Sequence, residues 1–129
     1  MSKFSKTSPI LATVLFFAYF NEVKSEYQPD LLNGRLQFLK CQVCHSLNSN
    51  DKKSGPSLVK LFGRKSGSLE GYEYSKAMKL AGIIWDKKEL NLFLENPISK
   101  IPGSKMIFNG LKRSSDRADV IAYLVSLQN

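Results

Sequence analysis

The residues with the most specific chemistry in this sequence are two thiols and an imidazole, in the order Cys41-Gln42-Val43-Cys44-His45. Two cysteines three positions apart at the end of a helix can face the same side and reach two neighbouring vinyl groups of one porphyrin. The histidine that follows would then lie under the iron. This spacing is typical of haem c attachment, and it predicts a haem held by two thioether bonds.

Three other interpretations of the cysteine pair are weaker. A zinc site usually takes four nitrogen or sulfur ligands, and the chain has only two cysteines and one histidine. A thioredoxin-like pair is expected after a strand at the start of a helix, in an alternating strand and helix pattern that is not visible here. A disulfide closing so short a loop would add little chain-entropy stabilisation. Covalent haem attachment is therefore the favoured interpretation.

A bound iron needs a second axial ligand or an open face. His45 is the only histidine, which excludes two histidine ligands from one chain and leaves methionine, lysine or an empty position. Met106 follows Pro102 and Gly103 in an irregular loop that can hold its thioether toward the iron, so we favour it. Met78 remains a minor alternative. Ligation by His45 and Met106 leaves no place for oxygen or substrate and suits outer-sphere electron transfer.

The first residues are typical of a targeting segment. Lys3 and Lys6 give a basic start, residues 10–20 form an apolar run, and the chain turns polar from Asn21 onward. The run is about half of the roughly 20 residues that span a bilayer as a helix. We therefore predict a signal peptide over residues 1–25, cleaved before Glu26, with an uncleaved anchor as the alternative. Residues 26–129 would form one domain outside the cytoplasm, in a bacterial periplasm.

The rest of the chain predicts helices separated by long loops. Asp30 can cap a helix that runs toward Cys41, Asp86 with Glu89 resembles a capping box, and a last helix starts near residue 114 or 115. Residues 46–68 are expected to form loops, with one short helical turn over 58–62, and residues 98–110 form a second irregular stretch. No segment shows strand alternation, so the predicted fold class is all-α.

Taken together, these segments closely resemble mitochondrial-type cytochrome c and its bacterial relatives, soluble or membrane-anchored. The resemblance covers nearly everything after the signal, and it is carried in the same order by residues 41–45, 55–58, 61–67, 71–74, Trp85, 94–97, 101–108 and 117–124. It implies the cytochrome c fold, in which the first and last helices pack together and a further helix and long loops wrap one haem.

The resemblance also implies roles for individual residues. The carbonyl of Pro56 would accept from His45 Nδ1, which fixes the ring. Gly34 and Tyr123 would form the small-against-aromatic contact between the first and last helices. The family also implies that Arg64, Tyr74 and Trp85 surround a buried haem propionate. Ser104, in the loop of the methionine, is a further haem-binding position.

The chain departs from the family pattern at three places. Phe93 stands where many relatives have a tyrosine whose hydroxyl reaches the methionine sulfur, and Met78 replaces a usually polar residue. After Pro97 the relatives' lysine pair is replaced by Ile98 and Ser99. The expected docking face at the haem edge is therefore basic but reduced, and it keeps Lys40, Lys105, Lys112 and Arg113.

The function that the resemblance implies is an electron carrier, not an enzyme, acting between a quinol-oxidising cytochrome complex and a terminal oxidase or other acceptor. The net charge of +8 fits a solvated basic surface as well as docking to acidic partner proteins or an anionic membrane surface. The basic residues are spread along the chain, which argues against nucleic-acid binding, and a monomer is expected. The alternative is a haem enzyme or oxygen-binding protein with an open iron site, and Met106 distinguishes the two.

Overall fold

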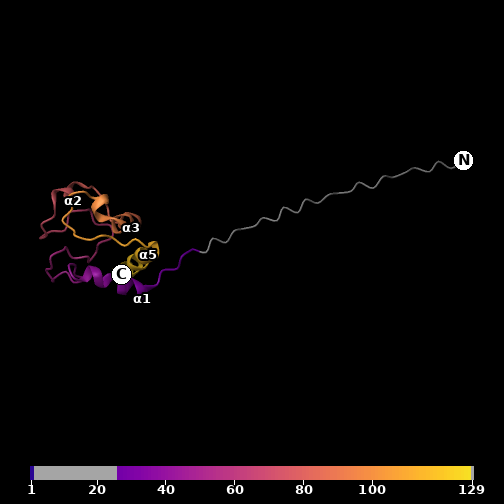
Figure 1. The fold of residues 1–129 in the computed structure, drawn as a ribbon, viewed down its shortest axis with the longest axis horizontal. Coiled ribbons are helices and arrows are strands. Elements are labelled where there is room, and N and C mark those ends of the chain that lie inside the picture. Colours follow the sequence, from indigo (N-terminus) through magenta and orange to yellow (C-terminus); the bar gives the residue numbers. More distant parts are fainter. Residues whose placement is uncertain (2–25, 129) are drawn as a thin grey trace.

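A computed structural model describes residue 1 and residues 26–128, and the described chain is folded from helices and loops (Figure 1). Its helices are α1 (Leu31–Gln42), α2 (Lys76–Leu80), α3 (Lys87–Glu95), α4 (Pro97–Lys100) and α5 (Ser114–Ser126). Within these residues the only extended pairing is an isolated antiparallel bridge between Lys65 and Ile84. No helix found there has the length and apolar character needed to cross a membrane. The signal peptide predicted over residues 1–25 lies, apart from Met1, outside the described residues.

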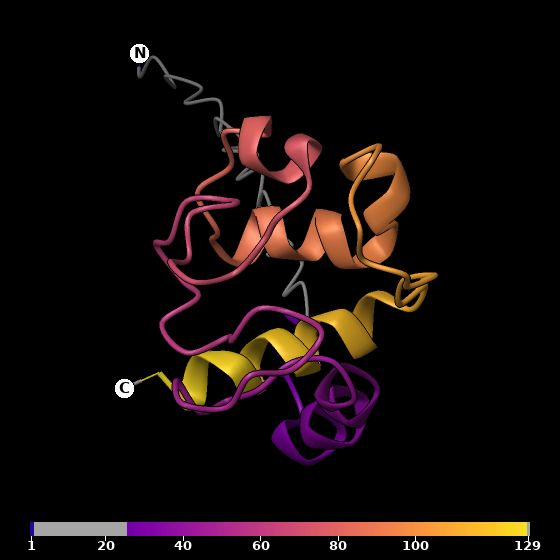
Figure 2. The same ribbon diagram turned by 90° about the vertical axis from the view of Figure 1, so that its left-hand side faces the viewer.

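The first and last helices form the largest helix–helix contact of the fold, and Figure 2 shows α5 between α1 and α3. α1 begins where predicted because the carboxylate of Asp30 accepts from the backbone N–H of Leu32 at 2.8 Å. The helices approach closely at Gly34, where an added Cβ would collide with the Asp119 carbonyl and lie 2.9 Å from Tyr123 Cβ. The expected contact of Gly34 with Tyr123 is therefore present.

α3 starts as the capping-box pattern predicts, with one difference in the partner of Glu89. The Asp86 carboxylate accepts from the Glu89 N–H at 2.7 Å. The Glu89 carboxylate does not return to the cap; it forms a 2.8 Å ion pair with Lys100 of α4. α3 and α4 are thus tied by side chains as well as by the chain itself.

Two short helices were not predicted from the sequence. α2 begins at Ser75, whose hydroxyl accepts from Met78 N–H at 3.1 Å, and it was not predicted. α4 begins at Asn96, whose side chain accepts from Ser99 N–H at 3.2 Å, with Pro97 in the first helical position. The predicted irregular stretch 98–110 is therefore wrong over its first three residues. Over 58–62 the chain forms a turn closed by Leu61 N–H to Leu58 O at 3.2 Å, not a helix.

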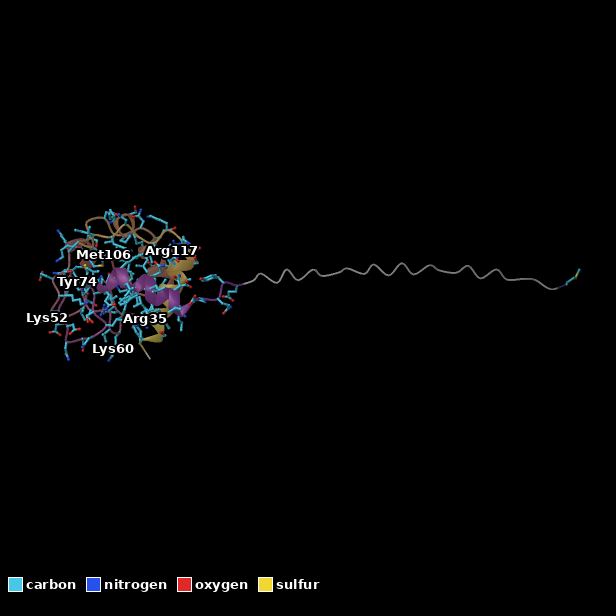
Figure 3. All side chains as sticks on the ribbon, turned by 60° about the horizontal axis from the view of Figure 1, so that its bottom comes forward. Arg35, Lys52, Lys60, Tyr74, Met106 and Arg117 are labelled. Atoms are coloured by element: carbon cyan, nitrogen blue, oxygen red, sulfur yellow. The ribbon has the colours of Figure 1, made fainter. Side chains whose placement is uncertain are left out.

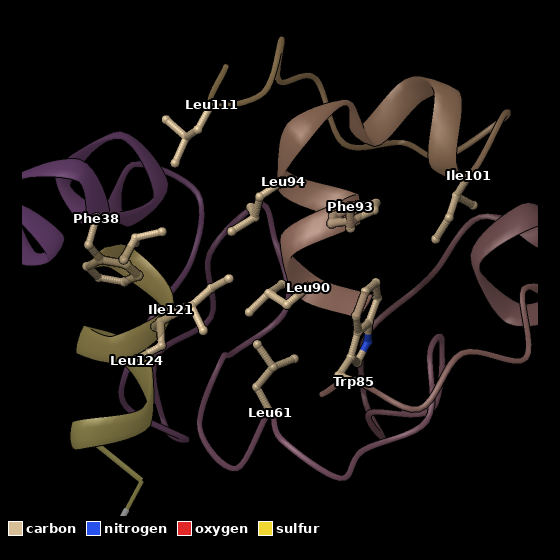
Figure 4. Packing of buried hydrophobic residues seen from close by; sticks show 11 residues of the cluster. Phe38, Leu61, Trp85, Leu90, Phe93, Leu94, Ile101, Leu111, Ile121 and Leu124 are labelled. Atoms are coloured by element: carbon tan, nitrogen blue, oxygen red, sulfur yellow. The ribbon is translucent and has the colours of Figure 1, made fainter. Parts of the chain in front are cut away.

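The buried apolar residues come from α1, α3, α5 and the loops between them (Figure 4). From α3, Leu90, Phe93 and Leu94 point inward, and Ile121 and Leu124 of α5 face them. Val120 of α5 is buried in the same cluster. Several of these side chains also form the wall of a cavity described below. The core is therefore arranged around an internal space.

Candidate functional site

The two cysteines lie at the carboxyl end of α1. The chain turns there through hydrogen bonds from the N–H groups of Cys44 and His45 to the carbonyl of Cys41, at 3.0 and 2.9 Å. Both thiols are free, and burial raises the pKa of the Cys41 thiol to about 11. A redox-active pair needs a lowered thiol pKa, which a helix amino end promotes. The carboxyl end of α1 and the raised pKa of Cys41 argue against that chemistry.

The ring of His45 is held by the backbone carbonyl of Pro56, in the loop that follows the histidine. Its Nδ1 lies 2.8 Å from the carbonyl oxygen of Pro56, so Nδ1–H donates and Nε2 keeps its lone pair. Burial lowers the pKa of His45, while the Pro56 carbonyl acts in the opposite direction. The neutral imidazole is the form that binds a metal.

Gly55 positions the His45 ring, a role that was not predicted from the sequence. An added Cβ there would lie 2.7 Å from His45 Cε1 and 2.9 Å from the carbonyl oxygen of Cys44. Only a residue without a side chain lets this strand approach the imidazole so closely. The signal in the sequence was that Gly55 directly precedes Pro56, the residue expected to accept from His45.

Met106 is carried by a loop with its own hydrogen bonds. The N–H of Ser104 donates to Ile101 O at 3.0 Å, and the Ser104 hydroxyl accepts from Met106 N–H at 3.3 Å. Gly103 between them has a φ of 88°, which glycine adopts without strain. Met106 is half-buried, and Met78 of α2 lies on the same cavity. The structure thus brings both candidate methionines to the site.

One cavity of about 330 Å³ unites the predicted site residues. This size falls in the range of ligand and cofactor sites. Its wall includes core side chains from α3 and α5, such as Leu90 and Val120, and Figure 3 labels Tyr74 and Met106 among its residues. All nine predicted positions line it: Cys41, Cys44, His45, Pro56, Arg64, Tyr74, Trp85, Ser104 and Met106.

The polar part of the wall is formed by Arg64, Tyr74 and Trp85. Arg64 donates to the carbonyls of Ser57 and Val59, at 2.9 and 3.1 Å. Burial lowers the pKa of Arg64 and raises the pKa of Tyr74. Trp85 lines the same cavity and is only 7% exposed. A half-buried cation beside a hydroxyl and an indole N–H suits a carboxylate that would otherwise be costly to bury.

These residues fit a covalently bound haem. Two thiols stand at the rim, a neutral imidazole is fixed below them, and the interior is largely apolar with donors at one end. Residues 26–128 contain no group of three or more histidine, cysteine or acidic side chains that could hold a metal ion on their own. A zinc site of the usual four-ligand kind therefore has no candidate in this part of the chain.

Comparison with known proteins agrees with this site. The family model described as cytochrome c matches residues 31–128. Cytochrome c of Theileria annulata is 52% identical over 86 residues, which cover 66% of this chain and 74% of that protein. Cytochrome c2 of Rhodomicrobium vannielii is 44% identical over 98 residues, covering 75% and 78%.

A solved structure shows the same fold. Cytochrome cH from Methylobacterium extorquens superposes with a TM-score of 0.70 at 37% identity, covering 75% of this chain and 98% of that one. The predicted all-α cytochrome c fold is confirmed. The chain belongs to the cytochrome c family: it is an electron carrier rather than an enzyme, with haem c attached covalently through Cys41 and Cys44.

Proposed function

We propose that this protein carries single electrons through a haem iron ligated by His45 and Met106, from a quinol-oxidising cytochrome complex to a terminal oxidase or another acceptor. The observation that carries the ligand assignment is that His45 Nδ1 is fixed by Pro56 at 2.8 Å while Met106 lines the same cavity. When bound, the haem supplies a one-electron iron couple.

The protein's own groups keep the site rigid during electron transfer. The Pro56 carbonyl orients His45, and the Ser104 hydroxyl holds the backbone of Met106. With His45 and Met106 as its ligands, the haem iron would have no open coordination site for substrate or oxygen. We assign Arg64, Tyr74 and Trp85 to a haem propionate, whose charge their donors would stabilise, and Ser104 to the methionine side of the cofactor.

We further propose that docking uses basic residues at the rim of the cavity. Lys40 and Lys105 line that rim, and Lys112 and Arg113 are exposed. Lys105 donates to the Glu73 carbonyl and lies 5.4 Å from the centre of the Tyr72 ring, and neither of these two contacts neutralises its positive charge. These features support acidic faces on the membrane-bound partners. We propose that the carrier acts as a monomer.

The compartment follows from the amino-terminal segment. We propose that residues 1–25 export the chain to the periplasm and are removed before Glu26, with a tether to the inner membrane if they are retained. The mass of the protein purified from its own cell tests this. A mass equal to residues 26–129 plus one haem is expected, and a mass that includes residues 1–25 would contradict cleavage.

Replacing Met106 tests the ligand assignment. Met106→Ala is expected to convert the iron to a high-spin form that binds added cyanide or imidazole quickly, because one axial position becomes open. Met78→Leu serves as the matched control, since Met78 lines the same cavity, and it should keep the low-spin spectrum. Visible absorption spectra of both oxidation states report the result.

Two outcomes would overturn the assignment. If Met78→Leu opens the iron and Met106→Ala does not, Met78 is the ligand. If the unmodified protein is already high-spin and binds cyanide at once, its iron is open, and a haem enzyme or oxygen-binding protein becomes the better interpretation.

A further inference from the structure

Gln128 follows α5 and makes two hydrogen bonds to a distant turn of the chain. Its Nε2 donates to the carbonyl of Leu58 at 3.1 Å, and its Oε1 accepts from the backbone N–H of Phe62 at 3.3 Å. The backbone N–H of Gln128 donates to Val125 O at 3.1 Å, which fixes the residue to the end of α5. The amide of this one side chain therefore closes the turn 58–62, in the loop that Figure 2 shows beside the carboxyl end of α5.

The guanidinium of Arg64 is bound by the same part of the chain. Its Nη2 donates to Ser57 O at 2.9 Å, and its Nη1 donates to Val59 O at 3.1 Å. The carbonyl of Leu58 lies between these two in the sequence, and it is the one that Gln128 holds. Three consecutive carbonyls therefore accept from only two side chains. If Gln128 releases the middle carbonyl, we expect the two that fix the guanidinium to move as well.

The turn needs such support because its backbone is strained at Lys60. Lys60 has a φ of 51°, and among the described residues it is the one non-glycine residue with a positive φ. A residue with a β-carbon adopts this left-handed conformation at a cost, and it persists only where surrounding contacts hold it. Within the turn, the Leu61 N–H donates to Leu58 O at 3.2 Å. The two bonds to Gln128 add support from outside the turn.

The turn also forms part of the wall of the haem cavity. Leu58, Leu61 and Arg64 line the cavity of about 330 Å³, whereas Gln128 does not. The backbone of Arg64 is fixed separately, because the backbone N–H of Trp85 donates to Arg64 O at 2.9 Å. What the turn decides is therefore the direction of the Arg64 guanidinium, and not the position of the Arg64 backbone.

We propose that Gln128 is a positioning residue for electron transfer: it holds the turn 58–62 so that the positive charge of Arg64 stays at the haem propionate. The inference rests on the proposed function, in which Arg64 is assigned to that propionate, and it adds a residue that does not touch the cofactor. A cation in the cavity wall stabilises the reduced haem relative to the oxidised haem, because reduction removes one positive charge from the iron. Releasing the guanidinium should therefore lower the reduction potential.

The reduction potential of haem-loaded Gln128→Leu tests the proposal, because leucine is of similar size and makes neither hydrogen bond. The protein is brought to equilibrium with a reference couple of fixed potential. The ratio of reduced to oxidised protein is expected to fall about threefold, which corresponds to a potential about 28 mV lower at about 59 mV per tenfold change for one electron. The visible spectrum should remain that of the unmodified protein, since Gln128 does not line the cavity.

Gln37→Leu is the matched control. Gln37 is another half-buried glutamine whose amide makes two hydrogen bonds: its Nε2 donates to Asn33 Oδ1 at 3.3 Å, and its Oε1 accepts from Lys40 Nζ at 2.7 Å. It lies on α1 and does not line the haem cavity. The same substitution should therefore leave the ratio nearly unchanged. A shift as large as that of Gln128→Leu would overturn the proposal, since the loss of any bonded amide would then have the same effect.

A double-mutant cycle with Arg64→Ala shows whether Gln128 acts through the guanidinium. Arg64→Ala is expected to lower the ratio of reduced to oxidised protein by more than Gln128→Leu does, and adding Gln128→Leu to it should cause no further change. A further fall of the same size in the Arg64→Ala protein would give Gln128 a role independent of Arg64 and overturn the proposal. An unchanged ratio in Gln128→Leu alone would also overturn it.

The same cycle separates this inference from the proposed function. If Arg64→Ala itself leaves the ratio unchanged, the assignment of Arg64 to a propionate fails, and the inference fails with it. If Arg64→Ala lowers the ratio while Gln128→Leu does not, that assignment stands, and only the positioning role of Gln128 is wrong.

Discussion

Phe93 lies in the apolar wall of the site. Its ring packs edge-on against Trp85, with ring centroids 5.1 Å apart, and it is 5% exposed. Both rings line the cavity that contains Met106. Where many relatives have a tyrosine, this chain therefore has no hydroxyl to reach the methionine sulfur. Met78, where many relatives are expected to have a polar residue, lines the same cavity, so two positions make this interior more apolar.

Phe93→Tyr is expected to raise the reduction potential. A hydroxyl that donates to the Met106 sulfur makes it a weaker electron donor, which favours the reduced iron. One hydrogen bond of ordinary net strength corresponds to about 20–60 mV for a one-electron couple. Redox titration measures the shift. Phe62→Tyr adds the same hydroxyl away from this cavity and should leave the potential unchanged. An unaltered potential in Phe93→Tyr would show that this hydroxyl has no influence here.

At the scale of elements, the pairing of α1 with α5 positions the haem-attachment motif. α1 ends in the cysteine turn, and α5 supplies Val120 and Leu124 to the cavity wall. The two helices meet at Gly34, and beside it the rings of Phe38 and Tyr123 lie 5.7 Å apart. The buried carboxylate of Asp119 also links α5 to the beginning of α1. It accepts from Asn33 Nδ2 at 2.6 Å and from Tyr27 Oη at 2.8 Å.

Gly34→Ala is expected to lower the free energy of unfolding by about 2–3 kcal/mol, because its methyl group would overlap the backbone of α5 at Asp119. Denaturant unfolding followed by Trp85 fluorescence measures the change. Leu36→Ala is the control on the same helix. Its side chain is exposed, so its effect should stay within about 0.5 kcal/mol. Equal free energies of unfolding for Gly34→Ala and the unmodified protein would mean that α1 and α5 can move apart at this contact without losing stability.

Asp119 predicts a specific acid sensitivity. Its burial alone would raise its pKa, but donors from the Asn33 side chain, the Asp30 backbone and the Tyr27 hydroxyl outweigh this and hold the pKa below its usual value. A carboxylate whose pKa is lower in the folded state stabilises the fold above its unfolded pKa of about 3.9. That contribution disappears as the pH falls through the folded value.

Comparing Asp119→Asn with the unmodified protein between pH 7 and pH 3 checks this. The variant should be less stable at pH 7 by about 1–3 kcal/mol, because one buried oxygen acceptor is replaced by a donor. The difference should shrink below about pH 4, where Asp119 of the unfolded chain takes up a proton while the native carboxylate stays charged, and it should be lost once the pH falls below the folded pKa. Tyr27→Phe, which removes one donor only, should show a smaller difference with the same trend. A difference that is constant across this range would exclude Asp119 as the titrating group.

At the scale of the whole molecule, the protein combines an internal apolar cavity with a strongly basic exterior. The wall residues Leu61, Leu90, Leu94, Val120 and Leu124 belong to the buried core, so the haem completes that core when it is bound. The chain carries a net charge of +8. Partner encounter and core stability therefore depend on different parts of the molecule.

Electron transfer to an acidic partner is expected to slow by about tenfold as ionic strength rises from about 10 mM to about 200 mM, because salt screens the charges that guide the encounter. Stopped-flow absorbance with a purified acidic redox protein measures the rate. A neutral small-molecule reductant is the control, and its rate should hardly change. A protein–protein rate that does not depend on salt would count against basic docking.

The attachment motif, the all-α class and the starts of the longer helices could be predicted from the sequence alone. These features act over a few residues: Cys41, Cys44 and His45 are neighbours, and Asp30 and Asp86 cap the chain that follows them at once. Sequence reasoning missed α2 and α4, because four- and five-residue helices have too little periodicity to detect and depend on Ser75 and Asn96 as caps. Only the tertiary structure decided which distant residues meet. It set Gly55 against His45, and it turned Leu36 and Leu39 outward while Phe38 between them is buried. Such contacts depend on how α1, α5 and the loops pack, and no short stretch of sequence contains that information.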